Sequence, residues 1–322
     1  MSLRADGRLA VNLVSAALDR DRPMIANLII TRRCNLSCGY CFEYDKVSPP
    51  VPLDTLKTRI DHIARLRSVI VTLTGGESLL HPGAAELVRH VNDRGMTPML
   101  NTNGFLLTKK WIDALNAAGL YGMQLSIDNA VPNEISKKSL KPLLPKLRLL
   151  AEHAKFRVRI NTVLGGGPPQ EAVEVTRVVR ELGFDASCSL MRHADGSIIP
   201  LDDRARAAYA EIRAMGKRAI LPDDFQHALV DGEDQPWKCR AGARTFHVCE
   251  HGLVHLCAPR MDSNGKPVAE YSVEDIRRAF DAPKACTARC PIAYAHHASR
   301  FDRFRAQSGP PERAKRHLPI AA

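Results

Sequence analysis

Residues 25–41 read IANLIITRRCNLSCGYC, and this segment constrains the fold more than any other. An apolar, β-rich run is followed closely by three cysteines, Cys34, Cys38 and Cys41. The C-x3-C-x2-C spacing puts three thiols on one tight loop around a common centre. Soft thiolates of this kind bind zinc, copper(I) or an iron–sulfur cluster. Structural zinc takes four ligands and no fourth Cys or His lies nearby, so the loop predicts a metal centre with one open position.

The composition limits the class of protein. The chain has 322 residues, 45% of them apolar, which is enough to bury one large domain with an appendage. Its longest apolar runs are far too short to cross a membrane, and the N-terminus lacks the pattern of a signal peptide. We therefore expect a cytoplasmic protein. The odd number of cysteines, nine, argues against a disulfide framework.

The charge of the chain is strongly positive. Lysine plus arginine exceed aspartate plus glutamate by 11, which favours an acidic partner such as nucleic acid, a phosphorylated substrate or an acidic electron carrier. The excess is largest near the C-terminus, between Arg300 and Arg316. Basic chain ends are commonly solvated, and we expect that of this one.

Apolar strand-like runs alternate with helical patterns along most of the chain. The runs are Ile25–Ile30, Ser68–Leu73, Pro98–Leu100, Met123–Ile127, Phe156–Val163 and Ala186–Met191. Between them, apolar residues recur at helical spacing, as in the stripe Ala84, Leu87, Val88 and Val91. This alternation predicts an α/β fold built from parallel βαβ units. Six units would form a partial, open-sided (β/α)6 TIM-like barrel that binds ligands at the carboxyl ends of its strands.

Polar and glycine residues cluster at those predicted strand ends. The candidates are Gly75, Gly76 and Glu77 after the second strand, Asn101 and Asn103 after the third, Ser126 and Asp128 at the fourth, and Asn161 in the fifth. Glycines let backbone groups approach a ligand closely, and a carboxylate can accept a hydrogen bond from an ammonium group. Each polar side chain could instead cap the helix that follows it.

The cysteine loop resembles the signature of the radical S-adenosylmethionine (radical SAM) enzymes, in which an aromatic residue, here Tyr40, precedes the last cysteine. The resemblance implies that Cys34, Cys38 and Cys41 hold a [4Fe-4S] cluster whose fourth iron is chelated by S-adenosylmethionine. An electron passed to the sulfonium then yields a 5′-deoxyadenosyl radical that abstracts hydrogen from a substrate.

The same resemblance gives roles to the strand-end residues. Gly75-Gly76-Glu77 would bind the amino group of SAM; the family usually continues with proline, and this chain has Ser78. Ser126, Asp128 and Asn161 are candidate contacts to the ribose or carboxylate of SAM. The full set of expected SAM-binding residues is Tyr40, Gly75, Gly76, Glu77, Asn101, Asn103, Ser126, Asp128, Asn161 and Met191.

Five further cysteines lie in the last quarter of the chain. The segments Thr245–Val248 and Gly252–His255 predict a β-hairpin, which would bring the flanking Cys239 and Cys257 together. Cys286 and Cys290 form a C-x3-C pair that a helix turn would present on one face. His247, His251 and His255, spaced by four, would point apart on such a hairpin, and we expect them to be core or surface histidines.

This region resembles the auxiliary-cluster extension of the SPASM and twitch subfamilies, which begins with the pattern formed here by Cys239, Gly252 and Cys257. The resemblance implies a second [4Fe-4S] cluster held by Cys239, Cys257, Cys286 and Cys290. Two alternatives remain open: a structural zinc site of four thiolates, and the use of Cys249 as a substitute ligand.

These assignments divide the chain into five parts. They are an N-terminal extension (1–24), the radical SAM partial barrel (25–200), a helical linker (201–236), the auxiliary cluster domain (237–295) and a basic C-terminal tail (296–322).

The expected activity is oxidation, or oxidative bond formation, of a small-molecule substrate, with the auxiliary cluster as electron acceptor. A peptide is less expected because only about 24 residues precede the first strand. Arg192, His193 and Asp195 follow the sixth strand and are candidate substrate contacts. Acidic flavodoxin or ferredoxin is the expected electron donor.

Three other activities compete with this interpretation. A radical epimerase would need a thiol that returns hydrogen to the substrate, and Cys188 at the end of the sixth strand is the candidate, although buried cysteines commonly act as small apolar residues. A peptide-modifying maturase would share the same chemistry. A zinc-dependent nucleic-acid-binding protein would explain the charge but not the strand-end residues.

Overall fold

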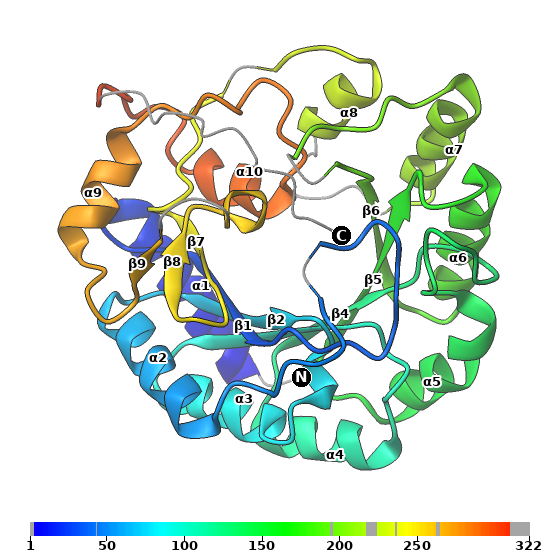
Figure 1. Cartoon of the computed structure of the whole chain (residues 1–322), viewed down its shortest axis with the longest axis horizontal. Helices are drawn as coiled ribbons and strands as arrows, with labels where there is room; N and C mark the ends of the chain where they lie inside the picture. The colour runs from blue at the N-terminus through cyan, green and yellow to red at the C-terminus, as the bar shows by residue number, and fades with distance from the viewer. Residues whose placement is uncertain are drawn as a thin grey trace.

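The structure, a computed structural model, describes residues 3–42, 44–193, 196–216, 224–235, 237–261 and 265–309. Nine strands of these residues form one mixed sheet in the order β6-β5-β4-β3-β2-β1-β7-β8-β9. The strands from β6 to β7 run parallel, and β8 and β9 add an antiparallel edge. Because β6 and β9 lie at opposite edges, the sheet does not close. The predicted α/β, open-sided, TIM-like barrel is confirmed (Figure 1).

The elements of the barrel alternate along the chain. The strands are β1 (Ile25–Thr31), β2 (Ile70–Gly75), β3 (Thr97–Thr102), β4 (Gly122–Ser126), β5 (Arg157–Leu164) and β6 (Asp185–Leu190). The helices that follow them are α2 (Leu53–Arg65), α3 (Ala84–Asp93), α4 (Lys109–Ala118), α5 (Leu140–His153), α6 (Pro169–Glu181) and α7 (Asp203–Ala214). These helices form an arc outside the sheet (Figure 1). None of the described helices combines the length and apolarity needed to span a bilayer.

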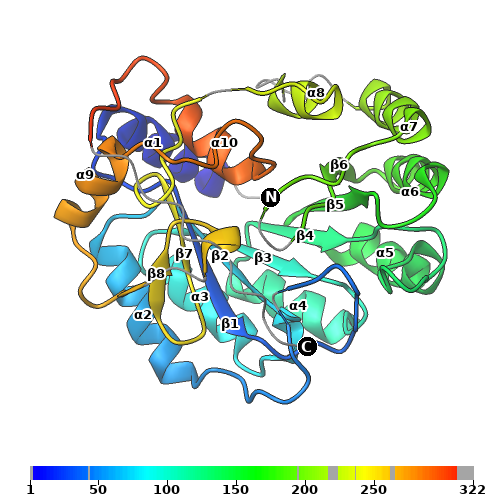
Figure 2. The same ribbon diagram turned by 45° about the horizontal axis from the view of Figure 1, so that its top comes forward.

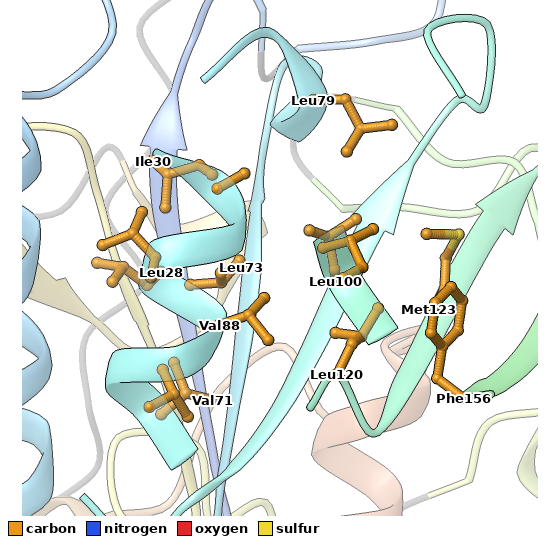
Figure 3. Packing of buried hydrophobic residues seen from close by; sticks show 14 of the residues in the cluster. Leu28, Ile30, Val71, Leu73, Leu79, Val88, Leu100, Leu120, Met123 and Phe156 are labelled. Atoms are coloured by element: carbon orange, nitrogen blue, oxygen red, sulfur yellow. The ribbon is translucent and has the colours of Figure 1, made fainter. Parts of the chain in front are cut away.

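The side chains that the barrel strands present to the helices are apolar, and several of those that they present to the interior are polar. Leu28 of β1 and Val71 of β2 point outward and pack with Val88 of α3 in the main core (Figure 3). On β4, Leu125 lies in this core, whereas Ser126 beside it lines a cavity. Alternation of this kind follows from the two-residue period of a strand. The barrel therefore offers a polar interior to a ligand.

The C-terminal hairpin belongs to the same sheet as the barrel. It consists of β7 (Thr245–Val248) and β8 (Leu253–His255), as predicted, and β9 (Lys266–Pro267) pairs with β8. The sequence did not indicate that β7 pairs in parallel with β1. The expectation that the three histidines point apart is wrong for two of them, because His247 and His255 are direct cross-strand partners and both are buried.

The Cys286–Cys290 segment is not helical, which corrects a second expectation. It forms turns between α9 (Val273–Asp281) and α10 (Ala293–Arg300). Trp237 donates from Nε1 to the carbonyl of Thr287 at 2.9 Å, and His296 bonds through Nε2 to the carbonyl of Cys290 at 2.8 Å. Hydrogen bonds to flanking segments thus hold the two cysteines in place without a helix.

An N-terminal helix, α1 (Leu3–Leu18), and the chain after α10 pack together beside the barrel (Figure 2). Their link is Arg244, which is fully buried and paired with the fully buried Asp302 through bonds of 2.6 and 2.9 Å. Arg244 also donates from Nη1 to the carbonyls of Ala16, Asp19 and Arg22. The tail was expected to be solvated, but the part that the structure describes, up to residue 309, is folded against the protein through Asp302. Arg313 and Arg316 lie outside the described residues.

We predict that Asp302→Ala lowers the free energy of unfolding by about 3–5 kcal/mol, because it leaves the Arg244 guanidinium buried without its counter-ion. Urea denaturation followed by circular dichroism measures the change. Asp113→Ala is the control: it removes an exposed ion pair with Lys109 and should cost about 0.5 kcal/mol or less. Equal losses in the two variants would contradict this account of the Arg244–Asp302 pair.

Candidate active site

A cavity of about 270 Å³ opens at the carboxyl ends of the barrel strands. Every strand from β2 to β6 contributes to its wall, and the loop after β1 covers one side. The residues that line it are Cys34, Leu36, Cys38, Tyr40, Cys41, Phe42, Tyr44, Thr74, Gly75, Gly76, Asn101, Thr102, Asn103, Gln124, Ser126, Lys138, Asn161, Val163, Ser189, Leu190, Met191 and Arg192. The position agrees with the rule that parallel sheets bind ligands at this edge.

The cysteine loop is tied at both ends by hydrogen bonds. Cys34 donates its N–H to the carbonyl of Asp45 at 3.0 Å, and Lys46 donates to the carbonyls of Cys34 and Leu36 at 3.1 and 2.7 Å. Within the loop, Cys41 N–H bonds to Cys38 O at 3.1 Å. The structure thus brings all three cysteines to one cavity.

Two glycines fit the second strand against this loop. Gly75 has a φ of 131°, a value that L side chains rarely adopt. A Cβ on Gly76 would lie 2.2 Å from the carbonyl oxygen of Arg32 and 2.4 Å from that of Arg33. The N–H of Gly76 bonds to Thr31 O at 2.8 Å. Only glycine therefore allows β2 to approach the backbone that leads into Cys34.

Glu77 lies behind the cavity wall and is fully buried. Its Oε1 accepts from Leu79 N–H and from the Thr102 hydroxyl at 2.9 and 2.6 Å, and its Oε2 accepts from Asn103 N–H at 2.7 Å. Burial raises the pKa of Glu77 above its ordinary value, although these hydrogen bonds oppose the rise. The carboxylate orients Asn103, whose amide donates to Asn35 Oδ1 at 2.7 Å and lies 3.7 Å from Cys34 Sγ.

Most of the other predicted SAM-binding residues reach the cavity. Those that line it are Tyr40, Gly75, Gly76, Asn101, Asn103, Ser126, Asn161 and Met191. Asp128 does not line it: the side chain is fully buried and accepts hydrogen bonds from Tyr40 and Ser136. Arg192 lines the cavity, His193 does not, and Asp195 lies outside the described residues.

Cys188 lies on the other face of β6. Its neighbours in the apolar cluster include Leu164, Tyr209 and Phe225, and it is absent from the cavity wall, where Ser189 is present. Burial raises the pKa of Cys188 to about 11. A hydrogen donor must reach the substrate, and the structure does not bring this thiol to the cavity.

Sequence analysis did not identify Lys138, Gln124 or Ser189, which also line the cavity. The two-residue period of a strand could have indicated two of them. Gln124 lies two residues before Ser126 on the same face of β4, and Ser189 lies two residues after Ser187 on the same face of β6. Lys138 lies in an irregular segment between β4 and α5. No periodic pattern predicts where such a side chain points.

The C-terminal cysteines form a second group beside a cavity of about 290 Å³. Cys257, Cys286 and Cys290 line this cavity. Burial raises the pKa of Cys257 well above its ordinary value, and the nearby Cys290, Cys239 and Cys286 raise it further. Burial likewise raises the pKa of Cys290 to about 12. The structure therefore places three of the four predicted auxiliary cysteines on one cavity, and Cys239 acts electrostatically on Cys257 and Cys290.

Cys249 lies at the other end of the hairpin. Its N–H bonds to Leu253 O beside the turn, at 3.0 Å, and its thiol lies near Arg59 of α2. Cys239 and Cys257 flank the open end of the same hairpin. The geometry thus separates Cys249 from the four cysteines that were predicted as ligands.

The cysteines of the first loop are placed where they could serve together as ligands of an iron–sulfur cluster. None of the nine cysteines is in a disulfide. A cubane needs thiolates spread around a larger centre, and Cys34, Cys38 and Cys41 are spread along the wall of one cavity. The residues present therefore fit a [4Fe-4S] cluster with three protein ligands.

The model of the radical SAM superfamily matches residues 28–192, about half of the chain. The chain belongs to the radical SAM superfamily. Membership implies S-adenosylmethionine and a [4Fe-4S] cluster as cofactors.

Similar proteins in the superfamily carry out different reactions. The AdoMet-dependent heme synthase of Methanosarcina barkeri is 31% identical over 164 residues, 48% of this chain and 46% of that protein. The GTP 3′,8-cyclase of Helicobacter pylori is 32% identical over 253 residues, 72% of each chain. This chain thus matches about half the length of the heme synthase.

The fold agrees with that of SuiB from Streptococcus suis, solved with its precursor peptide SuiA. The TM-score is 0.61 at 12% identity, and the alignment covers 94% of this chain and 78% of SuiB. At this identity the likeness shows a shared fold.

We predict that Gly76→Ala abolishes iron binding by the first cysteine loop, because the added Cβ would collide with the carbonyls of Arg32 and Arg33. Iron content after anaerobic reconstitution measures the loss. Gly7→Ala is the control, because a Cβ there meets nothing within 4 Å. Normal iron content in Gly76→Ala would show that the two strand ends can separate without loss of the site.

Proposed function

We propose that this protein cleaves SAM reductively and uses the resulting radical to oxidise, or to form a bond in, a small-molecule substrate. The observation that carries the proposal is that Cys34, Cys38 and Cys41 share one cavity with Gly76 and with polar strand ends. When bound there, a reduced [4Fe-4S] cluster supplies the electron that breaks the carbon–sulfur bond of SAM.

The residues of the chain bind and orient SAM around that centre. Backbone groups of Gly75 and Gly76 are accessible from the cavity and suit the amino group of SAM. Glu77 acts indirectly by orienting Asn103, because it is fully buried behind the cavity wall and accepts the Asn103 N–H. Ser126 and Asn161 line the cavity and suit the ribose or carboxylate. Asn161 is held by Ser187 and Ser189, which each donate to its Oδ1 at 3.0 Å.

We assign a second [4Fe-4S] cluster to Cys239, Cys257, Cys286 and Cys290, within an auxiliary domain of residues 237–295. The mutual proximity of the four thiols supports this assignment. Their fixed geometry supports it too: His296, which bonds to the carbonyl of Cys290, is stacked between Phe225 and Trp237 at 3.9 and 3.8 Å. Burial lowers the pKa of His296 to about 4, so the ring is neutral at pH 7. A cluster held by four cysteines can accept an electron from a substrate radical.

A small-molecule substrate is our proposal for the cavity. The heme synthase and the GTP cyclase act, by their names, on compounds of that size, whereas SuiB binds a peptide. Arg192 belongs to the cavity wall and interacts electrostatically with Cys290. Arg192 therefore lies between the two cysteine groups, where a substrate that reacts with both centres would bind.

Epimerisation is the less supported alternative. It needs a thiol that can return hydrogen to the substrate, and Cys188 packs away from the cavity among apolar side chains. Oxidation needs only an electron acceptor, which the second cysteine group would supply.

We infer a cytoplasmic location, because nine cysteines without a disulfide suit a reducing compartment. We also propose an acidic flavodoxin or ferredoxin as the electron donor. The net charge of +11 supports this choice, since opposite charges accelerate association.

The proposal predicts about eight irons per chain after anaerobic reconstitution and formation of 5′-deoxyadenosine from SAM on reduction. Replacing Cys34, Cys38 and Cys41 by alanine should leave about four irons and abolish cleavage. Cys257→Ala should lose about four irons and keep part of the cleavage. Iron analysis and chromatography of the nucleoside products measure both.

Cys249→Ala is the matched control, because this thiol lies by Arg59 and lines neither of the two cavities. It should keep about eight irons and full cleavage. Stoichiometric zinc, or cleavage by the triple alanine variant, would contradict the proposal. Four irons in the wild-type chain together with normal cleavage would contradict the auxiliary cluster and leave the rest of the proposal intact.

Reduction by flavodoxin should slow as salt is added, because the attraction between an acidic donor and this basic chain is screened. Stopped-flow absorbance of the clusters at 50 and 500 mM salt, conditions that shorten the Debye length severalfold, measures the rate. A small neutral reductant provides the control and should show no salt effect. A rate with flavodoxin that is independent of salt would rule out electrostatic docking.

A further inference from the structure

The wall of the first cavity contains a chain of hydrogen bonds between a lysine and a carboxylate. Lys138 donates from Nζ to the Tyr40 hydroxyl at 2.7 Å, and that hydroxyl donates to Asp128 Oδ2 at 2.7 Å. The ammonium also lies over the Tyr40 ring, 4.9 Å from its centroid. Ser136 donates to the same Asp128 oxygen at 2.6 Å.

The same segment contacts the cysteine loop. The N–H of Lys137 donates to Cys38 Sγ at 3.4 Å, and the Ser136 hydroxyl lies 4.0 Å from that sulfur. Cys38 and Cys41 act electrostatically on the Lys138 ammonium. Residues 136–138 therefore join one cation and one carboxylate to the thiols that would bind the cluster.

We propose that Lys138 and Asp128 form a charge pair that sets the reduction potential of the cluster held by Cys34, Cys38 and Cys41, with the Tyr40 hydroxyl as the bridge between them. The inference rests on the proposed function, because it concerns the cluster bound there. It gives Lys138 and Asp128 a role that does not require either side chain to touch a substrate.

The charges of both residues can act on the cluster because Asp128 is fully buried and Lys138 is only partly exposed. Asp128 is fully buried, and its Oδ1 accepts no hydrogen bond from the described residues. Lys138 donates from Nζ to the Tyr40 hydroxyl, and the ammonium is the ordinary form of a lysine side chain at neutral pH. The net charge and hydrogen bonding around an iron–sulfur cluster set its potential, and charges act over longer distances in such surroundings than in water.

Two effects of opposite sign follow. A positive charge near the cluster favours the reduced, more negative state, whereas a negative charge disfavours it. Loss of the Lys138 charge should make reduction harder, and loss of the Asp128 charge should make it easier. Removing both should nearly restore the original potential, because the two contributions cancel.

The test is a redox titration of the reconstituted full chain without SAM, followed by electron paramagnetic resonance. The signal of this cluster is identified as the one absent from Cys34→Ala. At a fixed potential, Lys138→Met should lower the ratio of reduced to oxidised cluster about tenfold, which is about 59 mV for one electron. Asp128→Asn should raise the ratio, and Lys138→Met combined with Asp128→Asn should return it close to the wild-type value.

Lys138→Arg keeps the charge and should keep the potential. Lys141→Met, an exposed lysine on α5, controls for the loss of one positive charge elsewhere and should have no effect. Shifts of the same sign in Lys138→Met and Asp128→Asn, or unchanged potentials in both, would overturn the inference and leave the proposed function intact. Absence of this cluster from the wild-type chain would overturn the proposed function itself.

Discussion

The architecture of the site depends on one steric constraint, the contact between the end of β2 and the end of β1. Gly76 presses against the carbonyls of Arg32 and Arg33 at distances that leave no room for a side chain. The backbone bonds from Gly76 to Thr31 and from Glu77 to Arg33 secure the contact. Cys34 follows directly, so this contact places the first thiol at the mouth of the barrel.

The C-terminal region is joined to the same place. Pairing of β7 with β1 makes the hairpin a continuation of the barrel sheet. Arg32 connects the two sides of the site, because its side chain donates to Glu250 at the hairpin turn at 3.3 Å and forms an ion pair with Asp45, which also binds Cys34. The segments that carry the two cysteine groups are therefore parts of one scaffold.

Local patterns in the sequence predicted the parts of this molecule that depend on local physics. The period of the strands, the C-x3-C-x2-C loop and the glycines after β2 could be interpreted directly, and the barrel and the shared cavity were predicted from them. Contacts between distant segments could not be predicted in this way. Pairing of Arg244 with Asp302 and the bond from Lys138 to Tyr40 join residues 58 and 98 positions apart. Local patterns do not predict contacts between residues so far apart in the sequence. The burial of Glu77 and Asp128 also depends on such contacts, and both residues were therefore expected in the cavity rather than behind it.

The proposed chemistry depends on three cysteines that would leave one position of a metal cluster open for SAM. Electron paramagnetic resonance of the reduced protein, recorded with and without SAM, is the decisive measurement. We expect SAM to change the spectrum of the cluster bound by Cys34, Cys38 and Cys41. A spectrum that stays the same at saturating SAM would mean that the position is already filled, and would contradict the account.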